Sequence, residues 1–200
     1  MKCWTSIGLL VSLALSSVAQ AATWKSPDGN LSFDLPSDGS LVEVKNPPAP
    51  AVAIWETRSG GGRLVFLSQP NAQNHALILP ALEKGTREAF PGATITSSTE
   101  TSQNGVPIFT IAASIKPGGY VQQTIVAFNH TLYKLMAAGQ KPIATDPHFS
   151  VSFQSFKILD PAPSSPGKWS ANDIARKVGI IVVALGFVAF AVYVLRKLFA

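Results

Sequence analysis

The sequence predicts an α+β protein: an antiparallel sheet of about six to seven strands, one main and one short helix packed on it, and a C-terminal single transmembrane helix. Three observations lead to this fold class. Most of the middle of the chain alternates apolar and polar residues with a period of two, as half-buried strands do. Residues 77–90 change to the helical period, and Val178 to Leu195 form an eighteen-residue run without a charge. The order strands, helix, strands, helix favours a sheet covered by helices.

The N-terminus has the features of a secretory signal. A lysine near the start is followed by an apolar run from Ile7 to Leu15 and then by small residues at Ala19 and Ala21. Charged, apolar and small-residue regions in this order are typical of a cleaved signal peptide. We therefore assign residues 1–22 to the signal and expect the mature chain to begin near Thr23. An uncleaved signal anchor, which would give two spans, is the alternative.

Two hairpins are predicted in the first part of the domain. A Ser-Pro-Asp-Gly turn separates a short strand around Trp24 from a second strand at residues 31–35. Further on, the three glycines of residues 60–62 separate strands predicted at 51–57 and 63–68. Glycine tolerates positive φ, so this stretch favours a tight connection between antiparallel strands.

Residues 77–90 form the one convincing amphipathic helix of the domain. Glu83 with Arg87, and Lys84 with Glu88, are oppositely charged pairs four residues apart on the polar face. A proline at position 80 fits only in a first turn, so either the helix begins just before it or an earlier turn is kinked. The residues predicted on the apolar face are Ile78, Ala81, Leu82, Gly85 and Ala89.

A meander of three or four antiparallel strands follows the helix. Asn104-Gly105 is a strong hairpin signal, and Lys116 to Gly119 and Asn129-His130 provide the other turns. The strand from Val106 to Ile115 places its apolar residues at every second position, so one of its faces is buried. The strands are predicted at residues 94–101, 106–115, 120–128 and 131–138.

A short helix is expected to close the domain, which we place at residues 23–159. Asp146 and Pro147 are typical of a helix N-cap and first turn. Phe149 and Phe153 are four residues apart, so a helix would lay both rings on the sheet.

The remaining residues predict a membrane anchor. Residues 160–174 are a Pro/Ser-rich spacer and juxtamembrane segment, 175–196 the transmembrane helix and 197–200 the cytoplasmic tail. A helix of eighteen residues covers about 27 Å, close to the ~30 Å hydrocarbon thickness of a bilayer. Basic pairs flank the run on both sides. With a signal in front, the topology is single-pass type I; a core helix and a removable sorting signal are the alternatives.

The charge distribution and the cysteine content exclude some classes of function. The net charge is +5, but between Thr23 and Lys168 eleven basic and ten acidic residues nearly balance, and the excess lies in the signal and the membrane flanks. Nucleic acid is therefore not an expected partner. The single cysteine, Cys3, lies in the signal, so the mature chain can form no disulfide and no cysteine metal site.

The chain contains no recognisable catalytic motif. The histidines His75, His130 and His148 have no spacing typical of metal ligands, and no G-x-S-x-G, S-x-x-K or H-E-x-x-H occurs. We therefore predict no catalytic residue, no metal and no cofactor.

A binding face is the more plausible kind of site. Trp55 and Tyr120 lie in predicted strands and would line such a face, with core packing as the ordinary interpretation of both. Arg58 and Arg63 flank the three glycines, which could form an anion nest but lack the Lys-Ser/Thr of a phosphate loop. The predicted binding face is thus Trp55, Tyr120, Arg58 and Arg63.

Several packing and turn positions resemble the PsbP-like fold. They are the helix end Ala89 to Ala93, the turn Asn104 to Pro107, the strand Leu132 to Leu135 and the closing Phe149 to Phe156. The resemblance covers about Trp24 to Ile158. This family includes extrinsic photosystem proteins and DcrB-like bacterial envelope proteins, so the resemblance implies a non-enzymatic accessory or binding module. This chain differs in lacking a lipobox and in having a C-terminal span.

Two functions are consistent with these features. The first is a binding or scaffold module held in a bacterial inner (cytoplasmic) membrane by a single span, with its main domain on the periplasmic or extracellular side. Its partners would be the membrane and another envelope protein or a small ligand. The alternative is an envelope enzyme, hydrolase-like, whose site is assembled only by folding.

Overall fold

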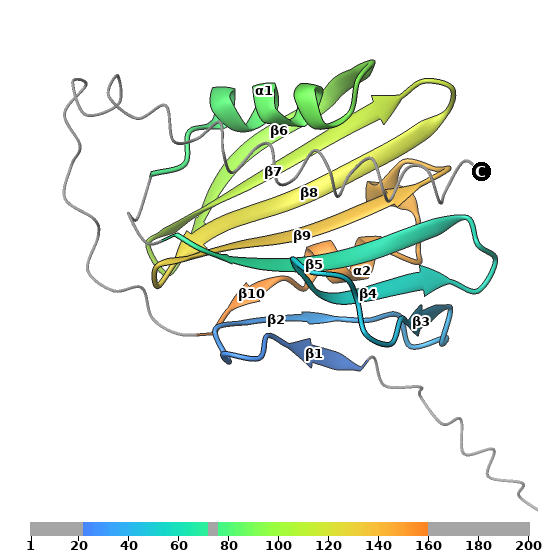
Figure 1. Cartoon of the computed structure of the whole chain (residues 1–200), viewed down its shortest axis with the longest axis horizontal. Coiled ribbons are helices and arrows are strands. Elements are labelled where there is room, and N and C mark those ends of the chain that lie inside the picture. Colours follow the sequence, from blue (N-terminus) through green and yellow to red (C-terminus); the bar gives the residue numbers. More distant parts are fainter. Residues whose placement is uncertain (1–21, 72–75, 160–200) are drawn as a thin grey trace, which may run out of the picture.

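A computed structural model describes residues 22–71 and 76–159, which form two antiparallel sheets with helices on them (Figure 1). The large sheet has the order β3-β4-β5-β9-β8-β7-β6, and the small sheet has the order β1-β2-β10. The strands of the large sheet are β3 (Leu41–Glu43), β4 (Ala51–Thr57), β5 (Gly62–Pro70), β6 (Ala93–Gln103), β7 (Val106–Ile115), β8 (Gly119–Phe128) and β9 (Thr131–Gly139). Those of the small sheet are β1 (Thr23–Lys25), β2 (Leu31–Asp34) and β10 (Lys157–Ile158).

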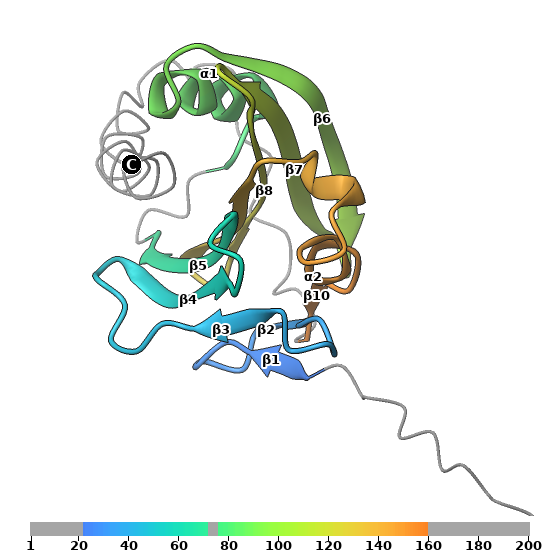
Figure 2. The same ribbon diagram turned by 90° about the vertical axis from the view of Figure 1, so that its right-hand side faces the viewer.

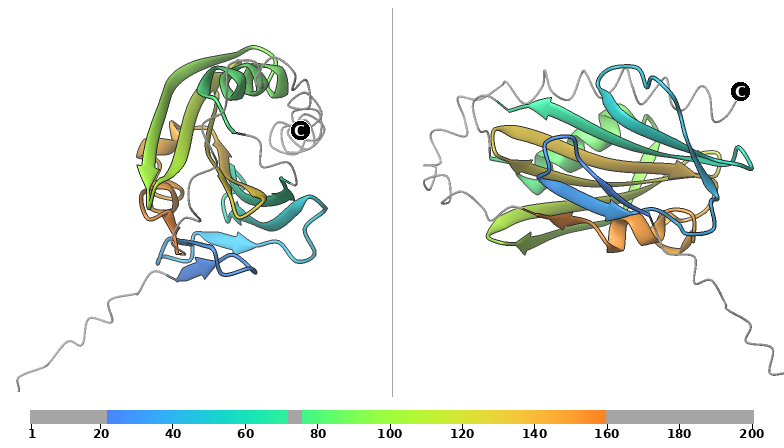
Figure 3. Two further views of the ribbon diagram at one scale, coloured as in Figure 1. Left: turned by 90° about the vertical axis from the view of Figure 1, so that its left-hand side faces the viewer. Right: turned by 90° about the horizontal axis from the view of Figure 1, so that it is seen from below.

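The two faces of the large sheet have different covers. The helix α1 (Leu79–Ala89) lies beside β6 on one face, as Figure 2 shows. The small sheet, the 3-10 helix η1 (Ile143–Thr145) and the short helix α2 (Ser150–Gln154) lie on the other face (Figure 3). The fold is therefore α+β, and the sheet is covered by helices on both sides.

The main core lies between the two sheets and is rich in aromatic side chains. Trp24 and Phe33 of the small sheet contact Trp55 of β4 and Phe66 of β5, with ring centroids 4.7–6.0 Å apart. Each such pair adds about 0.5–1.5 kcal/mol to the free energy of unfolding beyond simple burial. This cluster fixes the small sheet against β4 and β5.

The helix α1 is confirmed, and its proline lies in the first turn, so the helix begins just before Pro80. The predicted apolar face is wrong at Ile78, which is the N-cap residue and is 39% exposed. The buried residues are Thr86 and Ala89, and Leu79 and Leu82 pack towards the sheet. The contact face is thus centred on Leu79, Leu82, Thr86 and Ala89 rather than on the predicted residues.

Two further expectations are corrected. The large sheet has seven strands, as expected, but the described residues form ten strands in all, because β1, β2 and β10 form a separate small sheet. The closing helix starts at Ser150 and has Phe149 as its N-cap residue. Asp146 instead ends η1, and its Oδ1 accepts a hydrogen bond from the backbone N–H of His148 at 3.0 Å.

The predicted signal, spacer, transmembrane helix and tail lie outside the described residues, apart from Ala22. Within residues 22–71 and 76–159, no helix has the length and apolar character that crossing a bilayer requires.

Candidate binding site

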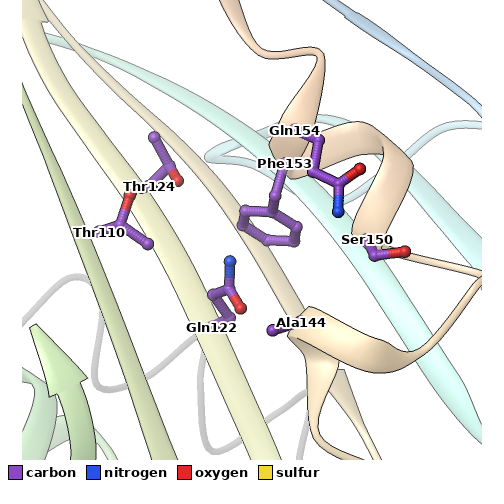
Figure 4. A pocket seen from close by; sticks show the side chains of 7 residues that line it. All are labelled: Thr110, Gln122, Thr124, Ala144, Ser150, Phe153 and Gln154. Carbon is purple, nitrogen blue, oxygen red and sulfur yellow. Dashed lines mark hydrogen bonds between the residues drawn. The ribbon is translucent and has the colours of Figure 1, made fainter. Parts of the chain in front are cut away.

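A pocket of about 180 Å³ lies between the large sheet and the η1–α2 segment. Its walls come from β7 and β8 on one side and from η1 and α2 on the other (Figure 4). The residues that line it are Thr110, Gln122, Thr124, Ala144, Ser150, Phe153 and Gln154.

The register of β7 and β8 determines which side chains form the polar wall of the pocket. Thr110 lies opposite Thr124, and Ala112 lies opposite Gln122. Residues directly opposite in an antiparallel pair point to the same face, so these side chains form one patch. Alternate residues of β7, such as Phe109, pack on the α1 side, which leaves Thr110 facing α2. The hydroxyl oxygens of Thr110 and Thr124 are 3.1 Å apart and hydrogen-bonded.

The helical wall is fixed to the small sheet by hydrogen bonds. Ser152 is fully buried, and its hydroxyl donates to the carbonyl oxygen of Asp34 at 2.8 Å. The hydroxyl of Ser155 accepts from the backbone N–H of Asp34 at 2.7 Å. Phe149 is buried at the start of α2, so Phe153 one turn later extends from an anchored helix into the pocket (Figure 4). Both walls are therefore rigid elements, which suits a preformed site.

The lining side chains are all uncharged. Three hydroxyl groups and two primary amides can each donate and accept hydrogen bonds, and one phenyl ring provides an apolar surface. None of these groups is a general base or acid near neutral pH. Across the described ranges, no group of three His, Cys, Asp or Glu side chains is placed to hold a metal ion. The arrangement can bind a neutral polar molecule.

The aromatic residues of the predicted binding face lie in or beside the core. Trp55 is 2% exposed, and its ring packs against Trp24 and Phe33. It therefore presents no surface to a ligand, and core packing is the correct interpretation. Tyr120 is half-buried and packs against the same core. Tyr120 shares its face of β8 with Gln122, although it does not line the pocket.

The two arginines of the predicted face have separate partners. The Nε of exposed Arg58 donates to the carbonyl oxygen of Gly39 at 2.7 Å. The side chain of Arg63 is 7% exposed and forms an ion pair with Glu56. The glycine stretch between them is a hairpin tip, in which the N–H of Gly62 donates to the hydroxyl of Thr57 at 2.9 Å. Neither arginine lines the pocket, and a binding role for Arg58 stays a prediction.

The histidines lie away from the pocket or outside the described residues. His75 is not among the described residues. His130 lies in the turn between β8 and β9 with a φ of 58°. His148 is half-buried, its ring centroid lies 6.4 Å from that of Phe149, and its Nδ1 has no hydrogen-bond partner among the residues that the structure describes.

The pocket residues were not singled out from the sequence, although a signal for them exists. Thr110, Gln122 and Thr124 are even-numbered polar residues, whereas the odd-numbered residues of β7 and β8 are apolar except for Gln123. Polar residues are ordinary on a solvated face. Only the expected helix carrying Phe149 and Phe153 indicated that this face is covered, and a polar face under a helix is a candidate pocket.

The architecture described above is the PsbP-like fold. The chain is similar to the solution structure of cyanobacterial PsbP (CyanoP) from Synechocystis sp. PCC 6803, with a TM-score of 0.55 and 12% identity over 76% of this chain and 99% of that chain. At this identity the likeness concerns the fold alone. The resemblance noted in the packing and turn positions is thus confirmed at the level of fold.

Two further solved structures are more distant. One is a protein of unknown function from Pseudomonas aeruginosa, PA94, described as a putative regulator, with a TM-score of 0.38 and 10% identity over 67% of this chain and 91% of that chain. The other is from Bacteroides thetaiotaomicron VPI-5482, with a TM-score of 0.43 and 10% identity over 78% of this chain and 56% of that chain. No family model and no curated protein matches the chain.

Proposed function

We propose that the protein is a membrane-anchored binding module of a bacterial envelope, which displays its PsbP-like domain outside the membrane. The observation that carries the proposal is the pocket between β7–β8 and α2. Its lining offers donors, acceptors and one aromatic ring, with no group suited to acid-base chemistry. Such a site binds without transforming what it binds.

The sequence supports the location. A signal at residues 1–22 and an uncharged run from Val178 to Leu195 would place the domain on the outer side of the inner membrane. The spacer of residues 160–174 has three prolines, which favours an extended tether.

Cysteine labelling tests the topology, because the mature chain carries no cysteine of its own. Ser59→Cys places a thiol at the exposed β4–β5 hairpin tip, and Ala200→Cys places one at the C-terminus. In intact spheroplasts, a membrane-impermeant maleimide should label only the Ser59→Cys variant, and lysis should expose the second site. Labelling of only the Ala200→Cys variant before lysis would show that the topology is the reverse of the proposed one and would contradict the proposal.

Photo-crosslinking tests the binding role in the membrane. A benzophenone amino acid at the exposed position Gln154, beside the pocket, should give a discrete adduct in intact cells. The matched control is the same group at exposed Ser102 on β6, the outermost strand of the large sheet. No adduct at Gln154, or the same adducts from both positions, would contradict a binding role for this site. Among the described residues, no observation favours the alternative of an envelope enzyme.

A further inference from the structure

We propose that the pocket binds a neutral sugar ring, either free or as a residue of an envelope glycan. This inference rests on the proposed function, because it names the ligand class of the same site. It follows from three properties of the pocket: the absence of charge in its lining, the pairing of the strands that form its floor, and the mixture of hydroxyl, amide and phenyl groups on its walls.

The lining selects against both charged and apolar ligands. A charged ligand would lose hydration without meeting an opposite charge, which is costly in a partly buried site. An apolar ligand would offer no hydrogen-bond partner to the hydroxyl and amide groups that line the pocket. A neutral molecule that both donates and accepts hydrogen bonds avoids both costs.

The pairing of β7 and β8 selects against an extended peptide. β7 lies between β6 and β8, and β8 lies between β7 and β9, so both strands already have neighbours on both sides. A peptide therefore cannot add as a strand at the pocket floor and gain backbone hydrogen bonds. The ligand must bond to side chains, of which the pocket offers hydroxyl and amide groups from both walls.

A sugar ring matches the remaining features. Hydroxyl groups surround the edge of a pyranose, whereas its faces carry C–H groups. The phenyl ring of Phe153 extends from α2 into the pocket and faces the strands that carry Gln122 and the threonine pair, so an apolar surface lies beside hydrogen-bonding groups (Figure 4). A volume of about 180 Å³ is below the roughly 300–1,000 Å³ of pockets for drug-sized ligands, so the site suits one ring better than a long chain.

Saturation-transfer NMR tests the proposal on the full chain. The protein is purified in a zwitterionic detergent, because glycoside detergents carry a competing sugar. The probes are glucose, galactose and N-acetylglucosamine, with glucuronate and glucosamine as charged analogues. We expect transfer to the ring protons of at least one neutral sugar, with a Kd on the order of 1 mM, and at least tenfold weaker binding of its charged analogues.

The double variant Thr110→Val/Thr124→Val locates the site. Replacing both partners of a hydrogen bond by apolar groups of the same shape leaves the free energy of unfolding nearly unchanged. It should weaken sugar binding roughly tenfold, because the ligand loses two hydroxyl partners. Phe153→Leu provides a second test through the aromatic surface. The matched control is Gln69→Leu on β5, outside the pocket, which should leave the Kd unchanged.

Three outcomes overturn the inference. They are no transfer to any neutral sugar, equal binding of the charged analogues, and binding that neither pocket variant weakens. If no sugar binds but the Gln154 photo-adduct still forms, the sugar inference fails and the binding module stands. If neither signal appears, both fail together.

Discussion

The ring of Phe149 lies directly over Gly62, so that a Cβ added at Gly62 would be 2.6 Å from Cζ of Phe149 and 3.1 Å from the carbonyl oxygen of Ala138. Gly139 lies opposite Gly62 in the β5–β9 register, and a Cβ there would be 3.3 Å from the same ring. The absence of side chains at Gly62 and Gly139 thus leaves space for the ring of Phe149, the N-cap residue of α2. Because Phe153 follows one turn later, the packing of Phe149 also determines the position of the helical wall of the pocket.

Gly62→Ala should therefore destabilise the protein by about 1–3 kcal/mol, because the added methyl group would be too close to the Phe149 ring and to the backbone carbonyl of Ala138. Urea denaturation of the full chain measures the change. Gly61→Ala is the matched control: it is the adjacent residue, and its Cβ would meet nothing closer than Ser59 Oγ at 3.8 Å. Equal effects of the two substitutions would show that Phe149 does not occupy this position.

Tyr133→Phe should cost about 1–2 kcal/mol at pH 7, because the buried hydroxyl bridges two groups. It donates to the carboxylate of Asp28 and accepts from Nδ2 of Asn30 at 2.8 Å. Burial raises the pKa of Asp28, but hydrogen bonds from Ser26, Tyr133 and Asn30 outweigh it and lower this pKa below 3.8.

A lowered carboxyl pKa stabilises the fold above about pH 4, and this contribution is lost as the pH falls through the folded-state pKa. The cost of Tyr133→Phe should accordingly shrink as the pH falls from 7 through the folded-state pKa of Asp28, where the acceptor becomes protonated. Tyr120→Phe, at a half-buried tyrosine of β8, serves as control. A cost that does not change over this titration would argue against an ionised acceptor.

Lys134→Met should change how the stability of the protein depends on pH. Lys134 is 6% exposed on β9, opposite Leu67 and Ile125, and burial lowers its pKa from 10.5 to about 7. Between those two values the unfolded chain binds a proton that the folded chain does not, so wild-type stability rises with pH. The free energy of unfolding of the variant relative to wild type should therefore be roughly 2–4 kcal/mol higher near neutral pH than at pH 10.

Denaturation curves of both proteins from pH 6 to pH 10 measure this difference. Lys116→Met, at an exposed turn lysine, should change the free energy of unfolding by less than about 0.5 kcal/mol at every pH. A gain for Lys134→Met that does not vary with pH would mean that the amine is not buried.

Thr86→Val should destabilise the protein by about 1–3 kcal/mol by removing a partner of a buried amide. The Nε2 of Gln123 donates to the hydroxyl of Thr86 beneath α1, and Gln123 Oε1 has no hydrogen-bond partner in the described part of the chain. The double variant Thr86→Val/Gln123→Leu should recover most of that loss, since an apolar pair needs no hydrogen bond. A double-mutant cycle measures the coupling, and strictly additive losses would contradict the contact.

Elements with a clear period were predictable from the sequence, whereas those that depend on distant neighbours were not. Residues 77–90 and the strand from Val106 to Ile115 carry their own periodicity, and both elements are present. The two-residue strand β10 has no pattern of its own. It exists because Lys157 and Ile158 pair with Ser32 and Leu31, a relation between the two ends of the domain.

The residues of the candidate site also differ in how far the sequence alone predicts their role. A large aromatic side chain such as Trp55 suits a binding surface, but the small sheet covers it, and the sequence does not specify what that sheet packs against. Thr110 and Gln122 are not recognisable as site residues from the sequence, because polar residues at alternate strand positions ordinarily face solvent. Their role as pocket walls depends on the position of α2. The packing of Phe149 against Gly62 and Gly139 determines that position.

The small sheet joins the first strands of the domain to its last one. Leu31 and Ile158 are both buried, and the N–H of Leu159 donates to the carbonyl oxygen of Asn30 at 2.8 Å. A ribosome produces β2 early and β10 only after nearly every other residue of the domain. Until β10 pairs with it, β2 has an unpaired backbone edge, so the small sheet can be completed only after the last strand of the domain is available.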